Sequence, residues 1–433
     1  MISDSVLIPE ETIMEDNGMH ELMSRALLGG RRSNMEGGPV ADGTSAPAVR
    51  IVNLILHEAM ERHASDIHIE PGINRLRIRL RVDGVLEPSE IEPPQDLSER
   101  LTSRIKVMAG LKTTERNLPQ DGRFTWDGAG HPTDVRVSTM PVMEGESLVL
   151  RLLTGAQELR RIVELGFSSE KEERFRSWCL HPYGLLLNVG PVNSGKTTTL
   201  YAALEFLNHP ERNIVTIEDP VECRIQGINQ MQINPRTNLT FAAGLRALLR
   251  QDPDVCMVGE IRDEETAEAA VRAALSGRLL FSTLHTDSAV GAVFRLLDMG
   301  IPPYLLAAAL LGIVAQRLVR RLCPKCRTEY EVGEGTREAA LLGRHYHKGI
   351  RLWKADGCEA CRHTGYQGRI AVQELLSVTT EIRQAIIERR DREGLKRLVQ
   401  NGGMVTLNDD AVAKALAGET SVEEIGRVIH GLF

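Results

Sequence analysis

Residues 185–199 of the chain read LLLNVGPVNSGKTTT and place an apolar run directly before a loop of small residues. The loop satisfies the pattern G-x-x-x-x-G-K-[ST] through Gly190, Gly195, Lys196 and Thr197. Between a strand and a helix, such a loop turns its backbone N–H groups toward phosphates, and the positive end of the helix dipole adds to the attraction. The stretch therefore predicts an α/β fold that binds a nucleotide.

The loop and the turn that follows it make up the expected phosphate grip. Lys196 is expected to reach the β- and γ-phosphates of ATP, and the Thr197 hydroxyl to hold Mg²⁺. Asn193 is the unusual member, because the turn favours a positive φ that Asn adopts less readily than Gly. A glycine-rich turn that matches by chance is the alternative, and the strand–helix context disfavours it. The candidate nucleotide-binding residues are Gly190, Pro191, Val192, Asn193, Ser194, Gly195, Lys196, Thr197 and Thr198.

Acidic residues follow two further predicted strands. Glu218 ends one of them, in IEDPVE at 217–222, and Glu260 follows the other, at 255–258. Parallel strands end at one edge of a sheet, so these carboxylates are expected beside the loop, where they can bind Mg²⁺ or activate the attacking water. His285 follows a third strand and could sense the γ-phosphate, although a lone histidine is more often structural. For either acid considered by itself, the alternative explanation is a solvent-exposed residue that caps a helix. The expected magnesium ligands are Thr197, Glu218 and Glu260.

The bulk composition limits the class of protein. A chain of 433 residues, 42% of them apolar, has room for two to four domains, and 4% of aromatic residues implies aliphatic cores. The formal net charge of −7 argues against a protein that coats nucleic acid. The N-terminus is acidic without an apolar core, so no signal peptide is predicted. The apolar run 304–315 is shorter than the roughly 20 residues of a membrane span. We expect it to form a buried helix in a cytosolic protein.

Changes in the sequence pattern divide the chain into five segments. Alternating apolar residues in 48–154 predict a small α/β domain, and strands alternating with helices in 155–322 predict a mainly parallel sheet around the loop. Residues 1–47 are expected to be a short N-terminal segment with a Gly/Ser/Pro-rich linker. A four-cysteine module at 323–365 and a helical region at 366–433 complete the expected organisation.

One strand of the small domain carries an arginine at every second position. Residues 75–84 read RLRIRLRVDG, with arginines on one face, apolar residues on the other and an Asp-Gly hairpin signal at the end. A nucleic-acid surface is one explanation, and a solvated strand face is the other. Acidic and basic residues nearly balance in 47–155, which weakens the nucleic-acid explanation. The arginines of this stripe are Arg75, Arg77, Arg79 and Arg81.

Four of the seven cysteines fall in two C-x-x-C pairs, Cys323/Cys326 and Cys358/Cys361. Paired cysteines in a cytosolic protein favour a metal over disulfides, and four thiolates suit tetrahedral Zn²⁺. Such a zinc is expected to be structural, because four protein ligands leave no open position for catalysis. Unbound thiols are the alternative.

A series of motifs spans residues 48–433 and resembles the secretion ATPases of the type II secretion and type IV pilus assembly superfamily. That family consists of hexameric traffic motors. The motifs that carry the resemblance, besides the phosphate loop, are ASDIHIEP (64–71), RIKVMAGL (104–111), LPQDGR (118–123), DVRVST (134–139), TIEDPVE (216–222), LRQDPDVCMVGEIRD (249–263) and STLHTDSA (282–289).

The resemblance implies a fold and roles for individual residues. It implies a PAS-like small α/β domain that covers the nucleotide, followed by a RecA-like P-loop ATPase domain. Glu260, in the Walker B segment, would polarise the attacking water. Glu218, in the Asp box, would organise water and Mg²⁺, and His285, in the His box, would couple the nucleotide state to conformation. The arginines that match segments supplying charge to the phosphates are Arg123, Arg136 and Arg151.

The resemblance also implies a biological setting. The expected protein is a cytoplasmic ATPase, peripheral at the inner membrane, that assembles as a homohexamer with ATP, Mg²⁺ and structural Zn²⁺. It would drive assembly of a pilus or pseudopilus through a polytopic inner-membrane platform protein, with a membrane-anchored recruiting protein as a further partner. No direct contact with nucleic acid is expected. Assembly-type members often carry the four-cysteine module, whereas retraction members generally lack it.

Two other functions share parts of this pattern. A hexameric nucleic-acid motor of the helicase kind uses the same loop and carboxylates, but the acidic balance and the lack of a basic aromatic groove argue against it. A nucleotide-gated scaffold with little hydrolysis has Asn193 as its only support. The family usually has Gly at this position, Thr in place of Val192, and often Gly in place of Asn238. These departures bear on the turnover rate more than on the function.

Overall fold

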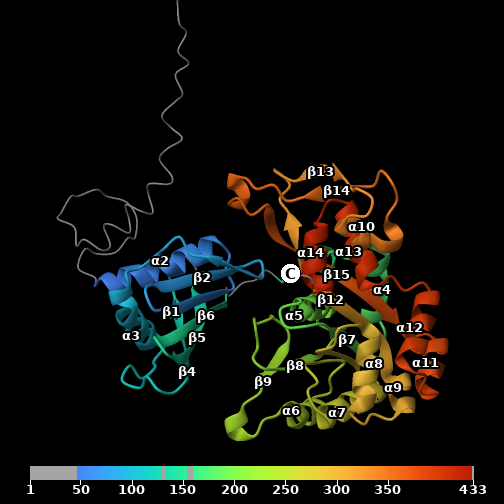
Figure 1. Cartoon of the computed structure of the whole chain (residues 1–433). Coiled ribbons are helices and arrows are strands. Elements are labelled where there is room, and N and C mark those ends of the chain that lie inside the picture. The colour runs from blue at the N-terminus through green and yellow to red at the C-terminus, as the bar shows by residue number, and fades with distance from the viewer. Residues whose placement is uncertain (1–45, 129–131, 154–158, 432–433) are drawn as a thin grey trace, which may run out of the picture. The chain divides into compact units, whose positions relative to one another are not determined.

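The computed structural model describes residues 46–128, 132–153 and 159–431 (Figure 1). The chain folds into two compact units, Met1–Gly155 and Ala156–Phe433. Most of the expected N-terminal segment and linker, residues 1–45, lies outside the described residues. Helices and strands carry the labels of Figure 1.

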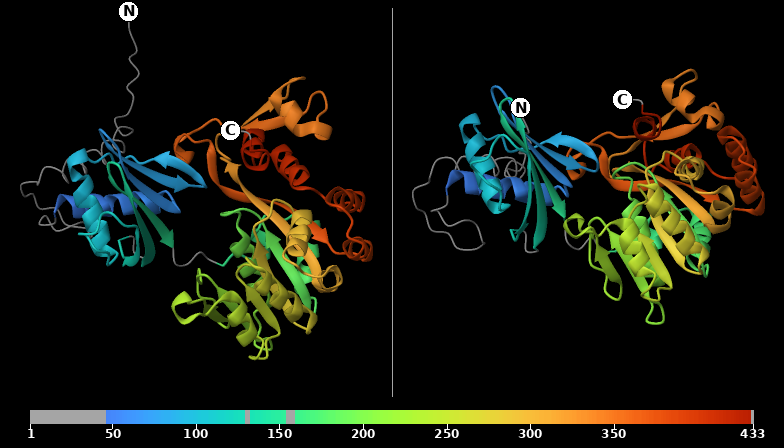
Figure 2. Two further views of the ribbon diagram at one scale, coloured as in Figure 1. Left: turned by 60° about the horizontal axis from the view of Figure 1, so that its bottom comes forward. Right: turned by 90° about the horizontal axis from the view of Figure 1, so that it is seen from below.

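The first unit is a six-stranded antiparallel sheet with two helices packed on one face (Figure 2). The strand order is β3-β2-β1-β6-β5-β4. The strands are β1 (Asp66–Pro71), β2 (Leu76–Val82), β3 (Val85–Pro88), β4 (Gln120–Trp126), β5 (Thr133–Val142) and β6 (Gly145–Leu153), and the helices are α2 (Pro47–Glu61), η2 (Gln95–Leu97) and α3 (Ser98–Met108).

The core of the first unit forms from matching periodicities. α2 buries Ile51, Ile55 and Ala59 at intervals of four residues, which places them on one side of the helix. The strands bury every second residue beneath the helices, so the other face of the sheet presents polar and charged side chains. The expected hairpin is confirmed, because Asp83 and Gly84 both adopt a positive φ between β2 and β3.

The second unit is built on a seven-stranded sheet with the order β15-β12-β7-β11-β10-β8-β9. Neighbouring strands from β12 to β9 are parallel, and β15 is antiparallel to β12. Every residue of the central strands is buried, as expected for a sheet covered by helices on both faces. The strands are β7 (Gly184–Val189), β8 (Ile214–Glu218), β9 (Asn229–Gln232), β10 (Val255–Val258), β11 (Leu279–Leu284), β12 (Leu310–Leu322) and β15 (Tyr366–Ser377).

Helices cover this sheet in two layers. One face packs against α4 (Ser169–Cys179) and α5 (Lys196–Leu207). The other face packs against α6, α7, α8 and α9, and this cluster continues into the C-terminal helices. The remaining helices are α6 (Phe241–Leu248), α7 (Glu264–Leu275), α8 (Ala289–Asp298), α9 (Pro303–Ala309), α11 (Thr380–Ile387), α12 (Arg392–Asn401), α13 (Leu407–Leu416) and α14 (Val422–Ile429), with the short turns η3 (Ile162–Glu164) and η4 (Pro235–Thr237).

Two expectations about the later segments are wrong. The apolar run 304–315 is not one helix, since α9 ends at Ala309 and β12 begins at Leu310. Residues 366–377, expected to open the helical C-terminal region, form β15, and only the residues after it are helical. In both cases pairing within the sheet overrides a local pattern, because β12 lies between β7 and β15.

The cysteine module is an insertion between β12 and β15. It contains a small hairpin and a short helix: β13 (Thr328–Glu331), β14 (Arg351–Lys354), α10 (Arg337–Leu342), η5 (Gly343–His345) and η6 (Glu359–Cys361). Within the described residues, no helix combines the length and apolar character needed to cross a membrane.

Candidate nucleotide-binding site

The phosphate loop lies where the sequence predicted it, between the buried strand β7 and the start of α5. Three of its residues adopt a positive φ: Gly190 (156°), Asn193 (62°) and Gly195 (84°). Asn238, the other asparagine that departs from the expected family pattern, also has a positive φ of 58°. Both asparagines therefore stand where the backbone is left-handed, and Asn is among the few side chains that tolerate this conformation.

Lys196 is held inside the loop by backbone carbonyls. Its Nζ donates to the carbonyl oxygens of Gly190 at 2.8 Å and Pro191 at 2.7 Å. Burial lowers its pKa to about 8, an effect that the nearby Glu260 carboxylate opposes. An ammonium that is buried with neutral partners gains much from an added anion, so the loop is poised to accept a phosphate.

Glu260 and His285 lie together at the end of the parallel strands. Glu260 follows β10 and His285 follows β11, and the distance between Glu260 Oε2 and His285 Nε2 is 3.5 Å. Arg262 donates to the other carboxylate oxygen of Glu260 and also lies 3.5 Å from Asp219. Glu260, which also interacts with Lys196, thus contacts both His285 and Arg262. The sequence placed Glu260 and His285 at this edge of the sheet but did not indicate Arg262.

Glu218 has a different environment from Glu260. Its carboxylate is buried and accepts hydrogen bonds from Tyr201, from Thr216 Oγ1 at 2.5 Å and from Gln230 Nε2 at 3.1 Å. Sequence reasoning missed Tyr201, whose phenol pKa is raised by burial and by the Glu218 charge. Its position on the helix after the loop was the only available signal. These three donors use three of the roughly four acceptor sites of the carboxylate, which leaves one site on Oε2 for a magnesium-bound water.

Three arginines of the first unit form a row across adjacent strands. Arg123 on β4 pairs with Arg136 on β5, which in turn pairs with Arg151 on β6. Together with Asp121 they line a hollow of ≈ 560 Å³. Arg151 is 3.0 Å from Asp66, whereas the other two form no ion pair within the described part of the chain. We call Arg123, Arg136 and Arg151 the arginine row.

Three arginines of the stripe, all on β2, lie on the same outward face and have acidic partners. Glu70 accepts from Arg77 at 2.9 Å and from Arg79 at 2.8 Å, and Arg81 is 3.8 Å from Asp66. These pairs reduce the positive charge that the stripe presents, although Asp66 is shared with Arg151. The structure therefore favours the solvated-face explanation over a nucleic-acid surface.

The four cysteines converge, although 31 residues separate the two pairs in the sequence. Their Sγ atoms all lie within 4.8 Å of one another, with Cys323–Cys358 at 4.0 Å and Cys326–Cys361 at 3.8 Å. Four thiolates at about 2.3 Å from a tetrahedral zinc would be about 3.8 Å apart. The backbone N–H of Gly365 also donates to the Cys361 sulfur, as is common for a metal-bound thiolate. The donor set and its geometry fit zinc.

Comparison with known proteins decides the family. The model of the Type II/IV secretion system protein family matches residues 41–427. The chain belongs to this family. It is 47% identical over 383 residues to the Type II secretion system ATPase E of Vibrio cholerae, covering 88% of this chain and 75% of the relative. It is 46% identical over 378 residues to the Type IV pilus assembly ATPase PilB of Thermus thermophilus, covering 87% of this chain and 42% of the relative.

Solved structures agree with the fold. The pilus retraction motor PilT with bound ADP aligns with a TM-score of 0.56 and 26% identity, covering 86% of this chain and 95% of that one. The ATPase DotB of Legionella pneumophila aligns with a TM-score of 0.67 and 21% identity, covering 92% and 100%, and supports the fold alone. These findings confirm the family, the α/β fold with a P-loop and a secretion-type ATPase that acts as an assembly motor.

Proposed function

We propose that the chain hydrolyses ATP at the phosphate loop and uses the energy to drive assembly of a pilus or pseudopilus through an inner-membrane platform protein. The observation that carries the proposal is Lys196, a buried ammonium bonded only to loop carbonyls and set beside Glu260 and His285. Family membership supports the use of this energy for assembly in a secretion or pilus system.

The residues of the loop have separate tasks in this proposal. Lys196 exchanges its carbonyl partners for the β- and γ-phosphates, while the first N–H groups of α5 donate hydrogen bonds to the other phosphate oxygens. Glu260 orients and polarises the attacking water. His285 contacts the γ-phosphate and changes its position when that phosphate is lost, which couples hydrolysis to the conformation of β11. Thr197, Glu218 and Glu260 would hold Mg²⁺, which neutralises charge on the phosphates.

The arginine row is a candidate source of positive charge for the phosphates. Among the described residues only Arg151 of the three forms an ion pair, with Asp66, so the row can accept an anion. We assign it to the triphosphate. An arginine that stabilises the transferring phosphoryl group contributes roughly 10³–10⁵ in rate.

Family membership supports a proposal for the assembly and its location. We propose a cytoplasmic homohexamer that associates peripherally with the inner membrane, contacts the platform protein and is recruited by a membrane-anchored partner.

The four cysteines would hold one structural zinc per chain. Metal analysis after mild purification is expected to find about one zinc per chain, and a chain without zinc would contradict this assignment.

Steady-state phosphate release with Mg²⁺ and ATP tests the proposal directly. The parent is expected to hydrolyse ATP, and Lys196→Ala to lose this activity. A parent that binds ATP without turning it over would instead support a nucleotide-gated scaffold. Stimulation by DNA would support the helicase alternative.

Asn193→Gly is expected to hydrolyse ATP, and the turnover rate of the parent should be equal to or lower than that of the variant. The reason is that a positive φ costs more energy in Asn than in Gly.

A further inference from the structure

A glutamine that no motif singled out lies directly behind the phosphate loop. Gln316 is on β12, the strand that pairs with β7, and its neighbour Ala315 is opposite Val189, the last residue before the loop. Its side chain is buried, with 2% of the residue exposed. A buried amide must be bonded at both ends to avoid a desolvation penalty, so its partners indicate its task.

Both ends of the Gln316 amide bond to the loop or to the first turns of α5. Its Nε2 donates to the Ser194 carbonyl at 2.8 Å, and its Oε1 accepts from the Thr199 hydroxyl at 2.9 Å. A carbonyl can only accept, so the first bond fixes which end of the amide is the donor. The side chain therefore joins the loop to the helix from a neighbouring strand.

The two glycines of the motif also pack against this residue. A Cβ on Gly190 would lie 2.5 Å from the Gln316 carbonyl oxygen, and a Cβ on Gly195 would lie 2.7 Å from its Nε2. Gln316 therefore fills the space where a side chain at Gly190 or Gly195 would lie. Glycine is needed at these two positions for this close packing as well as for the positive φ.

The bond to Ser194 fixes the orientation of one peptide group. In a trans peptide the C=O and the following N–H point in opposite directions. With the Ser194 carbonyl held toward β12, the Gly195 N–H is directed away from β12, and within the described residues it donates to no protein acceptor. Asn193, before Ser194, has a left-handed backbone that is costly for a residue other than glycine, and Gly195, after it, can change conformation freely. The peptide group between Ser194 and Gly195 can therefore reorient once the bond is lost.

We propose that Gln316 is a positioning residue for nucleotide binding, which holds the Ser194–Gly195 peptide so that its N–H faces the phosphates. The nature of the ligand rests on the ATPase function proposed above. Gln316 does not touch the nucleotide in this account and acts only through the loop.

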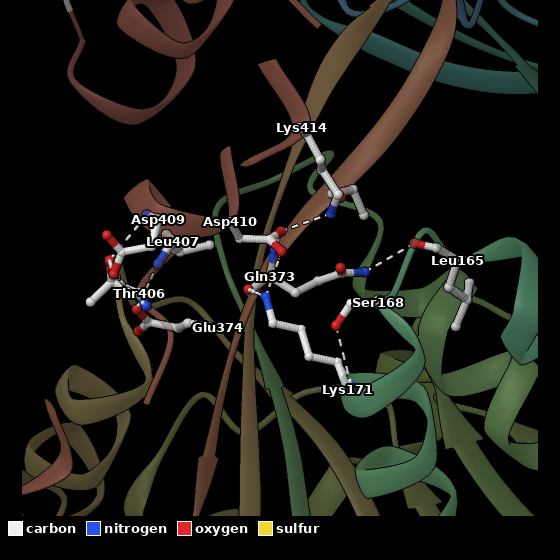
Figure 3. Close-up of polar contacts among 11 residues, drawn as sticks. Leu165, Ser168, Lys171, Gln373, Glu374, Thr406, Leu407, Asp409, Asp410 and Lys414 are labelled. Atoms are coloured by element: carbon white, nitrogen blue, oxygen red, sulfur yellow. Dashed lines mark hydrogen bonds and ion pairs between the residues drawn. The ribbon is translucent and has the colours of Figure 1, made fainter. Parts of the chain in front are cut away.

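The chain offers a matched control in the glutamine opposite Gln316. Gln373 on β15 is its cross-strand partner, is completely buried and donates from Nε2 to the Leu165 carbonyl at 2.9 Å. Figure 3 shows it beside the buried ion pairs of Lys171, Asp410 and Lys414. Among the described residues its side chain bonds to Leu165 and not to the phosphate loop. Removing either amide deprives one backbone carbonyl of its buried donor, but only Gln316 serves the phosphate loop.

The test compares Gln316→Met with Gln373→Met, since methionine keeps the length of the side chain and cannot donate. We would measure the Kd for a fluorescent ADP analogue, the KM and kcat for ATP, and the thermal midpoint. Both variants are expected to lose similar stability. Gln316→Met should raise Kd and KM by about tenfold, whereas Gln373→Met should leave both within about twofold of the parent.

Thr199→Val provides a second variant that removes only the hydroxyl partner of Gln316. It should raise Kd by a smaller factor than Gln316→Met, because the Ser194 bond remains. Should Gln316→Met fail to fold, an unchanged Kd in Thr199→Val overturns the proposal. Equal effects of the two methionine variants, or a Kd within twofold of the parent in Gln316→Met, overturn it as well. A parent that binds nucleotide without hydrolysing it contradicts the ATPase function instead, and the Kd comparison still decides the role of Gln316.

Discussion

Two sets of arginines share the outward face of the first unit's sheet, and they differ in their partners. The stripe on β2 faces the acids of β1, where Glu70 pairs with Arg77 and Arg79, and Asp66 lies near Arg81. The arginine row crosses β4, β5 and β6, and only one of its members has an acidic partner in the described structure. A count of arginines does not separate the two sets, whereas their partners do.

The difference has a physical basis in the sheet. Along one strand, every second side chain is on the same face, and such neighbours are about 6.6 Å apart. Side chains of directly paired residues on adjacent strands are closer, at about 5 Å. Like charges in direct cross-strand pairs are destabilising. Arg123, Arg136 and Arg151 occupy such positions. Only Arg151 of the row is ion-paired in the described structure, although Asp121 lines the same hollow, whereas three arginines of the stripe are paired. The row is therefore better suited to bind an anion than the stripe.

The largest expected effect separates the two sets by activity. Arg123→Ala combined with Arg136→Ala should lower kcat for ATP hydrolysis by about 10³ or more, because the developing charge on the phosphates loses its stabilising cations. Arg77→Ala combined with Arg79→Ala removes the same charge from the same face and should leave kcat within about twofold. Steady-state phosphate release at saturating ATP measures both. Unchanged turnover in the first pair, or equal losses in both, would remove the distinction between row and stripe.

A smaller effect is expected on stability. Glu70→Gln leaves Arg77 and Arg79 without their shared acid and should lower the stability of the first unit by about 0.5–1 kcal/mol. Arg136→Ala relieves like-charge repulsion and should not destabilise through charge. Thermal unfolding at low and high salt measures both, and salt should shrink the Glu70→Gln effect because it screens exposed charges. A loss that is independent of salt would point to packing instead.

The smallest effect concerns His68, on β1 between the two sets. Burial lowers its pKa, Arg81 lowers it further, and Glu70 raises it. Folding therefore favours the neutral ring, so the stability contributed by this residue is present above about pH 6.5 and declines as the pH falls through the folded pKa. Arg81→Ala should raise the pKa of His68 and Glu70→Gln should lower it, as followed by NMR titration of the ring. Shifts in the opposite directions would show that the charges on this face are not coupled as described.

Much of the site could be predicted from sequence because its parts are local. The loop motif, the acids that follow strands and the paired cysteines each occupy a short segment with its own spacing. The parallel sheet then brings the ends of its strands to one edge, where Glu260 and His285 were both expected, and the two lie 3.5 Å apart. The turn was likewise expected to favour a positive φ at Asn193, which has a φ of 62°.

The features that were missed depend on pairing between distant segments. The bond between Gln316 and Thr199 joins residues 117 positions apart, and it exists because β12 extends the sheet beside β7. The apolar run that leads into β12 has the composition of a buried helix or strand alike, so its second half was wrongly expected to be helical. Tyr201 could not be assigned to Glu218 for the same reason, since no local spacing connects them.

The central claim is that this loop hydrolyses ATP with Glu260 as the group that activates water. Glu260→Gln keeps the size of the side chain and removes its charge, so nucleotide should still bind while the water loses its activating group. The account predicts a Kd within about threefold of the parent and a fall in steady-state ATP hydrolysis of at least about 100-fold. Hydrolysis by Glu260→Gln at the parental rate, or a parent that hydrolyses no ATP in the presence of Mg²⁺, would contradict it.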